Sequence, residues 1–95
     1  MEVIFTGVFR KWLNTLRDKT ARTVILKHID RMKNGNLGDT KNLGEQIFEK
    51  RIFYGAGYRL YFINKNGQLI IILCGRDKSS QPKDIKKAKQ IVKEI

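Results

Sequence analysis

The segment from residue 46 to residue 76 constrains the fold more than any other part of this sequence. Apolar residues recur there at every second position, which is the period of a β-strand, and two glycine-containing breaks divide the segment. Asn66-Gly67 predicts a type I′ hairpin turn, and Gly55-Ala56-Gly57 predicts a second tight turn. The pattern therefore predicts three antiparallel strands, at 46–54, 58–65 and 68–76.

The two turns set the pairing register, and the register sorts the side chains onto two faces. One face is predicted to be apolar and to cover helices, with Lys50 as its misfit; its members are Phe48, Ile52, Leu60, Phe62, Leu69, Ile71 and Leu73. The other face carries Arg51, Arg59 and Arg76, with Tyr61 among them and Glu49 at the edge.

In this register Arg59 is a diagonal neighbour of both Arg51 and Arg76, at a Cβ separation of about 7 Å. Like charges this close repel one another unless an anion lies between them. Planar, permanently charged donors beside an aromatic ring suit a phosphodiester with a stacked base. The alternative interpretation is a solvated sheet face with scattered charge.

Helical spacing appears on both sides of the strand segment. After a short strand at Val3–Phe5, one predicted apolar helix face comprises Phe9, Trp12, Leu13 and Leu16, and the next comprises Ala21, Val24, Ile25, His28, Ile29 and Met32. Thr20 is a candidate N-cap for the second helix, and residues 37–44 are predicted to be a polar loop. A last helix begins near Pro82, with an apolar stripe of Ile85, Ala88, Ile91, Val92 and Ile95.

The charge balance points to polyanionic partners. The 95 residues include 20 Lys and Arg against 9 Asp and Glu, a net charge of +11. The longest apolar run, Leu69 to Cys74, is too short to span a bilayer. The N-terminal segment does not have the pattern of a signal peptide. The single cysteine, Cys74, lies within that run and is expected to be a small core residue. We therefore expect one cytoplasmic domain over residues 1–95, with no membrane partner.

The order of these segments resembles the RelE/ParE superfamily of toxins, and more specifically the addiction-module killer proteins similar to HigB. The resemblance rests on FRKWLNTLRDKTAR (9–22), KNGNLGDTKNLGE (33–45), EKRI (49–52), GAGYRLYF (55–62) and CGRDKSSQPKDI (74–85). It implies an α+β fold of order β-α-α-β-β-β-α, in which an αα-hairpin packs on one face of a four-stranded, mostly antiparallel sheet.

The resemblance also implies a function. A relative of this kind is the toxin of a type II toxin–antitoxin module, acting as a ribosome-dependent mRNA endoribonuclease without metal or cofactor. Its partners are a cognate antitoxin, expected to be a helix-turn-helix protein, and the ribosome with its mRNA; operator DNA is reached only through the antitoxin. Two alternatives stay open: inhibition of DNA gyrase, as in ParE-type members, and a non-catalytic nucleic-acid-binding or co-repressor module.

Site residues follow from matching the motifs. Glu49 and Arg51 match the superfamily's Glu-Leu-Arg-Ile stretch, Arg59 its Gly-Tyr-Arg stretch and Lys78 its Asp-Lys stretch. Metal-free RNA cleavage needs a base for the 2′-hydroxyl, cations at the phosphate and an acid for the leaving oxygen.

We assign the base to Glu49, the phosphate to Arg51 and Arg59, and the leaving group to Arg76 or Lys78. Here Lys50 replaces the usual leucine, and Arg76 stands where glycine is frequent. The His and Tyr that some relatives carry near the C-terminus are absent. The residues expected to bind nucleic acid are Lys41, Tyr61, Lys83, Lys86 and Lys87.

Overall fold

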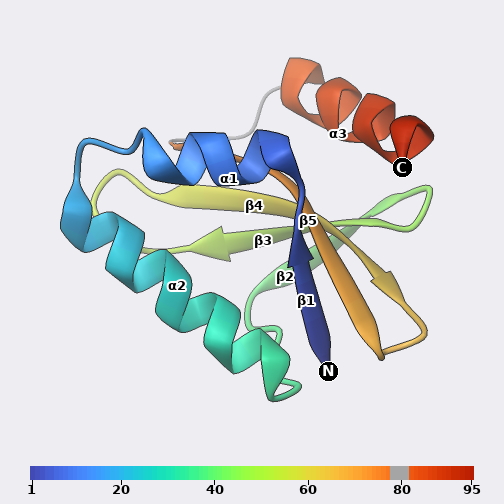
Figure 1. The fold of residues 1–95 in the computed structure, drawn as a ribbon, viewed down its shortest axis with the longest axis horizontal. Helices are drawn as coiled ribbons and strands as arrows, with labels where there is room; N and C mark the ends of the chain where they lie inside the picture. Colours follow the sequence, from blue (N-terminus) through green and yellow to red (C-terminus); the bar gives the residue numbers. More distant parts are fainter. Residues whose placement is uncertain (78–81) are drawn as a thin grey trace.

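The computed structural model describes residues 1–77 and 82–95 of the chain (Figure 1). The strands are β1 (Glu2–Phe5), β2 (Thr40–Gly44), β3 (Ile47–Ile52), β4 (Tyr58–Lys65) and β5 (Leu69–Asp77). The helices are α1 (Gly7–Asn14), α2 (Lys19–Lys33) and α3 (Pro82–Glu94). The predicted α+β class and the order of the predicted elements are confirmed, with one strand added.

The described strands form a five-stranded sheet in the order β1-β5-β4-β3-β2, with β1 parallel to β5 and the other neighbours antiparallel. The prediction of four strands was wrong because β2 lies in the segment taken for a polar loop. An edge strand exposed to solvent has no need of apolar alternation. Its turn into β3 also lacks a glycine at the two positions with positive φ, which are Glu45 at 54° and Gln46 at 67°.

Helices α1 and α2 cover one face of the sheet, as Figure 1 shows. The Thr6 hydroxyl caps α1 by accepting a hydrogen bond from the Phe9 amide. Asp18, rather than the predicted Thr20, caps α2, because its carboxylate accepts from the amides of Thr20 and Ala21 at 3.0 Å. The core on this side comprises Phe9, Leu13, Ile25, Ile29, Met32, Ile52, Leu60, Phe62, Ile70 and Ile72.

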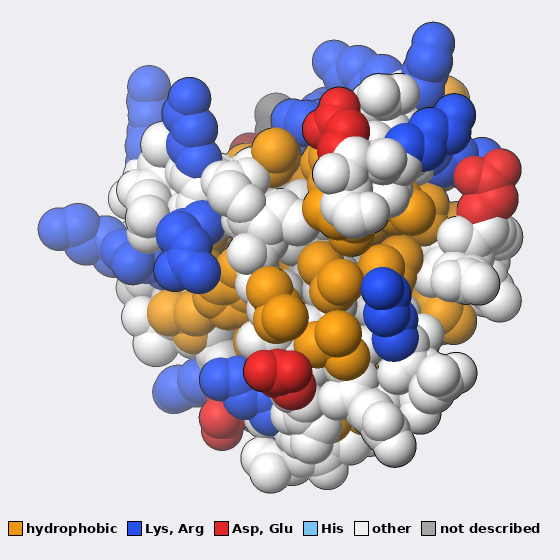
Figure 2. Space-filling view, turned by 45° about the vertical axis from the view of Figure 1, so that its right-hand side comes forward, with side chains coloured by type: hydrophobic (Ala, Val, Ile, Leu, Met, Phe, Trp, Pro, Cys, Tyr) orange, Lys and Arg blue, Asp and Glu red, His pale blue; other side chains and the backbone are white. Residues whose placement is uncertain are grey.

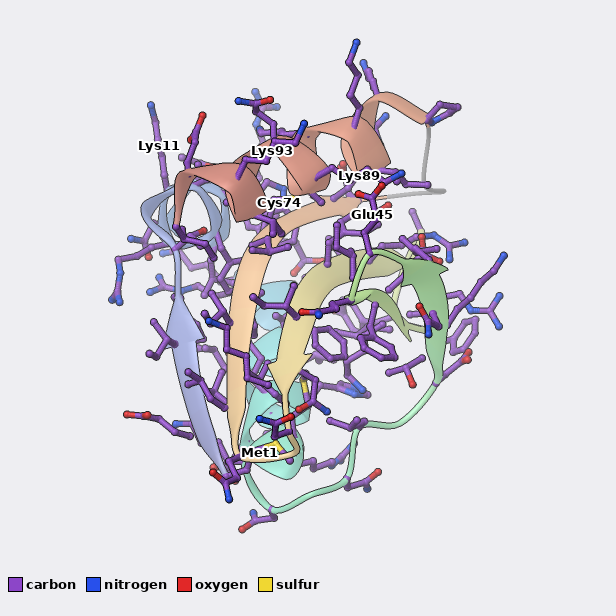
Figure 3. All side chains as sticks on the ribbon, turned by 90° about the vertical axis from the view of Figure 1, so that its right-hand side faces the viewer. Met1, Lys11, Glu45, Cys74, Lys89 and Lys93 are labelled. Carbon is purple, nitrogen blue, oxygen red and sulfur yellow. The ribbon has the colours of Figure 1, made fainter. Side chains whose placement is uncertain are left out.

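Helix α3 covers part of the opposite face. Ala88 and Ile91 of its apolar stripe are buried, and they pack with Ile47, Tyr61, Ile63, Leu73 and Cys74. Figure 3 shows α3 passing over the sheet with Cys74 beneath it. The face that carries the arginines is therefore partly covered, because the apolar stripe of α3 packs against its apolar residues.

The β3–β4 register differs from the prediction by two residues. The connection spans 53–57, five residues rather than three, so that Arg51 lies directly opposite Arg59 and Ile52 opposite Tyr58. A shift of two leaves every side chain on its predicted face, since strand side chains alternate with a period of two.

A β-bulge in β5 overturns part of the predicted apolar face. The β4–β5 register shifts by one between the pairs Tyr61↔Cys74 and Phe62↔Ile72, which leaves Leu73 as the extra residue. Consequently Ile70 and Ile72 face the helix pair, whereas Ile71 and Leu73 pack on the α3 side. Positions beyond the bulge, including Arg76, keep their predicted face.

Trp12 and Gly75 form the closest approach of α1 to the sheet. A Cβ atom built on Gly75 would lie 2.5 Å from Cζ3 of Trp12, so only glycine leaves room for the indole ring. The ring also meets Phe9, at a centroid distance of 5.7 Å. This contact fixes the position of α1 on β5.

Lys50, the misfit on the apolar face, is 1% exposed. Its ammonium donates to the backbone carbonyl of Leu37 at 2.6 Å, beneath Gly38. Burial lowers the pKa of Lys50, Arg31 lowers it further, and Asp39 opposes the shift. The buried cation therefore ties the loop before β2 to β3.

We expect Gly75→Ala to destabilise the fold by about 1–3 kcal/mol, because the added methyl group overlaps the Trp12 ring. Chemical denaturation measures the change. Gly7→Ala is the matched control, since nothing lies within 4 Å of its added methyl group and the position is helical. Equal stability of the two variants would contradict the assigned contact.

We expect the free energy of unfolding of the native chain to rise relative to that of Lys50→Met as the pH increases towards about 10. The folded-state pKa of Lys50 lies below the unfolded value of about 10.4, so between the two values the unfolded chain binds more protons. Below the folded-state pKa the cost of the buried charge is fully present and the difference is flat. Urea unfolding at several pH values checks the sign; a difference that falls with pH would refute it.

Candidate nucleic-acid interface

Three arginines line up across three adjacent strands. Arg51 of β3 pairs in register with Arg59 of β4, and Arg59 pairs with Arg76 of β5. Directly paired residues share a face, so the three side chains form one row on the side of the sheet that α3 partly covers. The sequence predicted this meeting, although with diagonal rather than direct contacts between the strands.

Each guanidinium of this arginine row is held by a carboxylate of the same chain. Arg51 pairs with Asp39, Arg59 with Glu49 and Arg76 with Asp84, each at 3.0 Å. The expectation of three guanidiniums that need an external anion was therefore wrong. The carboxylates that relieve the repulsion come from the segment before β2, from β3 and from α3. The strand register places Glu49 on the arginine face, but it does not reveal Asp39 or Asp84.

The ion pairs differ in the solvent exposure of their side chains. Arg51 and Asp39 have side chains 46% and 41% exposed, and an exposed pair contributes only about 0–1 kcal/mol. Glu49 is 5% exposed and its Arg59 partner 22%. Removing one member of such a buried pair costs about 3–5 kcal/mol, because the other charge stays buried. Arg51 thus belongs to the most exposed of the three ion pairs.

Tyr61 does not stack on a nucleotide in this structure. It is 0% exposed, beneath α3, so the predicted stacking role was wrong. Phe53 lies beyond the row instead, two positions after Arg51, and is 78% exposed. The Arg51 guanidinium lies 5.5 Å from the centroid of the Phe53 ring. The signal in the sequence was a large aromatic residue next to a glycine turn, which leaves the ring without an apolar partner.

Arg51, Phe53 and Arg59 line a hollow of about 180 Å³ at the β3–β4 turn, together with Gly57. The Nε atom of Arg59 is buried there without a hydrogen-bond partner in the described part of the chain. The hollow thus offers an exposed cation and an exposed aromatic ring, which are groups that bind a phosphate and a base.

The other predicted site residues are spread around this row. Lys41 is exposed and pairs in register with Glu49, so it shares the face. Lys83, Lys86 and Lys87 are exposed on α3. Lys78 lies outside the described residues. Figure 3 shows Lys89 of α3 beside Glu45 of the β2–β3 turn, with Nζ and Oε1 3.8 Å apart.

An isoleucine row crosses the same face beyond α3. Ile4, Ile71, Ile63 and Ile47 are consecutive register partners on β1, β5, β4 and β3. Ile47 is fully buried, whereas Ile4 is 43% exposed, because α3 covers only one end of the row. Figure 2 shows a face on which hydrophobic side chains gather, with Lys and Arg around its rim.

Metal-ion sites and membrane-spanning helices are both absent from residues 1–77 and 82–95. No group of three or more His, Cys, Asp or Glu side chains is arranged there to hold a metal ion. No helix within the same residues has the length and apolar character that a membrane span requires. Burial raises the pKa of the Cys74 thiol to about 11, so it carries no thiolate at neutral pH.

No protein-family profile matches the sequence. An uncharacterized protein of Haemophilus influenzae is 45% identical over 95 residues, which cover all of this chain and 96% of that protein. The two proteins belong to one family. Because the match runs from end to end, the fold described here applies to both.

Solved structures with the same fold are E. coli RelE proteins. The isolated RelE toxin superposes with a TM-score of 0.67 at 15% identity, over 95% of this chain and 97% of that one. A double arginine-to-alanine mutant in the free state gives 0.68 at 16% identity, over 99% and 96%. A chain of the intact RelBE toxin–antitoxin complex gives 0.60 at 13% identity, over 84% and 98%. The chain thus has the RelE fold, as its motifs predicted.

Proposed function

We propose that this protein is the toxin of a type II toxin–antitoxin module and that it binds and cleaves mRNA on the ribosome, in the cytoplasm. The observation that carries the proposal is the arginine row next to exposed Phe53 on a RelE fold. The HigB-like motifs of the sequence favour the same function.

Arg51 and Phe53 perform the binding in this proposal. A phosphate displaces Asp39 from Arg51, since the exposed pair is weak, and the neighbouring base stacks on Phe53. Arg59 lines the same hollow and is the second cation near the phosphate. The exposed Arg51 guanidinium stabilises the charge that develops at phosphorus.

Glu49 is the carboxylate that accepts the proton of the 2′-hydroxyl. Its oxygen lies 3.0 Å from Arg59 and is almost fully buried. Cleavage therefore requires the Glu49 and Arg59 side chains to turn towards the hollow when the phosphate binds. The phosphate then accepts some of the hydrogen bonds that Arg59 donates to Glu49 in the free protein. Arg76 holds α3 through Asp84, and its role at the leaving oxygen stays a prediction.

The closed ion pairs favour a second candidate function, a module that binds nucleic acid without cutting it. If Glu49 never leaves Arg59, no base is available and the exposed lysines of α3 with Arg51 provide only affinity. Inhibition of gyrase is the third candidate, and it makes the arginine row dispensable.

An antitoxin partner fits the exposed end of the isoleucine row. Ile4 and half-buried Ile71 form an apolar strip at the edge strand β1, and the chain carries a net charge of +11. An acidic segment with one apolar side complements both features. We propose that such a segment, attached to a helix-turn-helix antitoxin, covers this strip.

We expect Arg51→Gln to relieve the growth arrest that the induced native chain causes, with a loss of RNA cleavage of about 100-fold or more. Mapping of mRNA 5′ ends after brief induction measures cleavage. Asp39→Asn is the matched control: it breaks the same exposed ion pair but leaves the cation, so cleavage persists. New 5′ ends that survive Arg51→Gln would contradict the site.

The same induction separates the three functions. Early double-strand breaks with intact mRNA would indicate gyrase, and RNA binding without new 5′ ends would indicate the non-catalytic module.

We expect Ile4→Lys to weaken the complex with the product of an adjacent antitoxin gene by about tenfold or more, because a charge replaces apolar contact area on the strip. Affinity measured on purified proteins tests this. Leu26→Lys is the matched control, since Leu26 is 39% exposed on α2, on the other side of the sheet. Equal losses for the two variants would place the antitoxin elsewhere.

A further inference from the structure

A second hollow lies on the other side of the sheet from the arginine row. It measures about 370 Å³ and is bounded by the end of α1, the link to α2, the start of β4 and the end of β5. Tyr58 and Asp77 are register partners that line it, and the next pair along the strands, Arg59 and Arg76, points to the opposite face. Nothing in the proposed cleavage uses this hollow.

The walls of the hollow are aromatic. The rings of Trp12 and Tyr58 meet edge to face, with centroids 6.3 Å apart at 67°. Trp12 is held in place because it rests on Gly75, where a Cβ atom has no room. Half-buried aromatic rings in fixed positions attract cations to their faces.

The charge at the hollow is negative, in contrast with the chain as a whole. Asp18 and Asp77 both line it, and neither forms an ion pair with any other residue that the structure describes. One oxygen of Asp18 caps α2, which leaves the second oxygen available. After burial, these two carboxylates are the main causes that raise the pKa of Tyr58. Arg17 also lines the hollow, so the charged side chains around it, two carboxylates and one guanidinium, sum to one negative charge.

We propose that this hollow binds an arginine side chain of a protein partner, with the guanidinium between Trp12 and the carboxylates of Asp18 and Asp77. A planar guanidinium stacks on an aromatic ring and donates to carboxylates at the same time, which an ammonium does less well. A nucleotide does not fit the same chemistry, because its phosphate would meet two carboxylates.

The site also has a consequence for partner choice. The long-range electric field of a chain with net charge +11 repels basic proteins. The hollow therefore selects a partner by one arginine in the right position, and not by the overall charge of that partner. It is thus separate from any surface that recognises RNA or an acidic antitoxin segment.

The test uses the fluorescence of Trp12, which is the single tryptophan of the sequence. N-acetyl-arginine amide is titrated into the full chain at low ionic strength, with N-acetyl-citrulline amide as the neutral probe of the same shape. We expect a saturable change with the arginine probe and none with the citrulline probe. A response to both probes alike, or no saturable response to arginine, would overturn the proposal.

Variants assign the response to the carboxylates. Asp77→Asn is expected to weaken binding of the arginine probe about tenfold. Asp18→Asn removes the second charge but keeps a capping side chain, so it decides the question if Asp77→Asn fails to fold. Asp30→Asn removes an equal charge from the exposed face of α2 and is expected to leave binding unchanged.

Competing ligands define the source of the cation. Spermidine that binds more tightly than the arginine probe would make this a polyamine site and overturn the assignment to a protein side chain. Saturable binding of adenosine monophosphate at Trp12 would overturn the cation assignment itself. If Asp30→Asn weakens binding of the arginine probe as much as Asp77→Asn does, the effect comes from the net charge of the protein and the proposed site is overturned.

Discussion

The pairing of β4 with both of its neighbours is the constraint on which the rest of the structure depends. It places Arg51, Arg59 and Arg76 in one row, and it buries Glu49 beside Arg59. Because the row lies on one face, the opposite face is free to pack against α1 and α2. The hollow lined by Arg51 and the hollow lined by Trp12 both lie at the end of the sheet where β4 begins. They are on opposite sides of the sheet, since neighbouring register pairs point in opposite directions.

Charge compensation decides what this surface is able to do. In a chain of net charge +11, three of the nine acidic residues pair with the arginine row and offset the repulsion among its guanidiniums. The three ion pairs differ in how exposed their side chains are, and they join different parts of the fold. The Glu49–Arg59 pair joins β3 to β4, the Arg76–Asp84 pair joins β5 to α3, and the Arg51–Asp39 pair is the most exposed of the three.

Much of the fold was predictable because its signals are local. The period of two, the Asn66-Gly67 turn with positive φ at both residues, and the two apolar helix faces each depend on neighbours in sequence. The strand β2 was not predictable in this way, because it is polar and its turn contains no glycine at the positions that need positive φ. The bulge at Leu73 was hidden as well, since Leu69 to Cys74 is apolar throughout and any register satisfies the pattern.

The sequence by itself determined which faces the arginines, Glu49 and the core residues of β3 and β4 take, because alternation along a strand survives a register shift of two. It did not do so for Ile71 and Leu73, which the bulge in β5 moves to the α3 side. Only the tertiary structure decided which carboxylate meets which guanidinium, since Asp39 and Asp84 approach the row from segments outside the three paired strands. It also decided that α3 covers Tyr61 and leaves Phe53 in solvent, because a helix of fixed length covers only part of a sheet. Strand alternation thus placed the three arginines on one face, whereas the accessibility of each side chain depends on packing between distant elements.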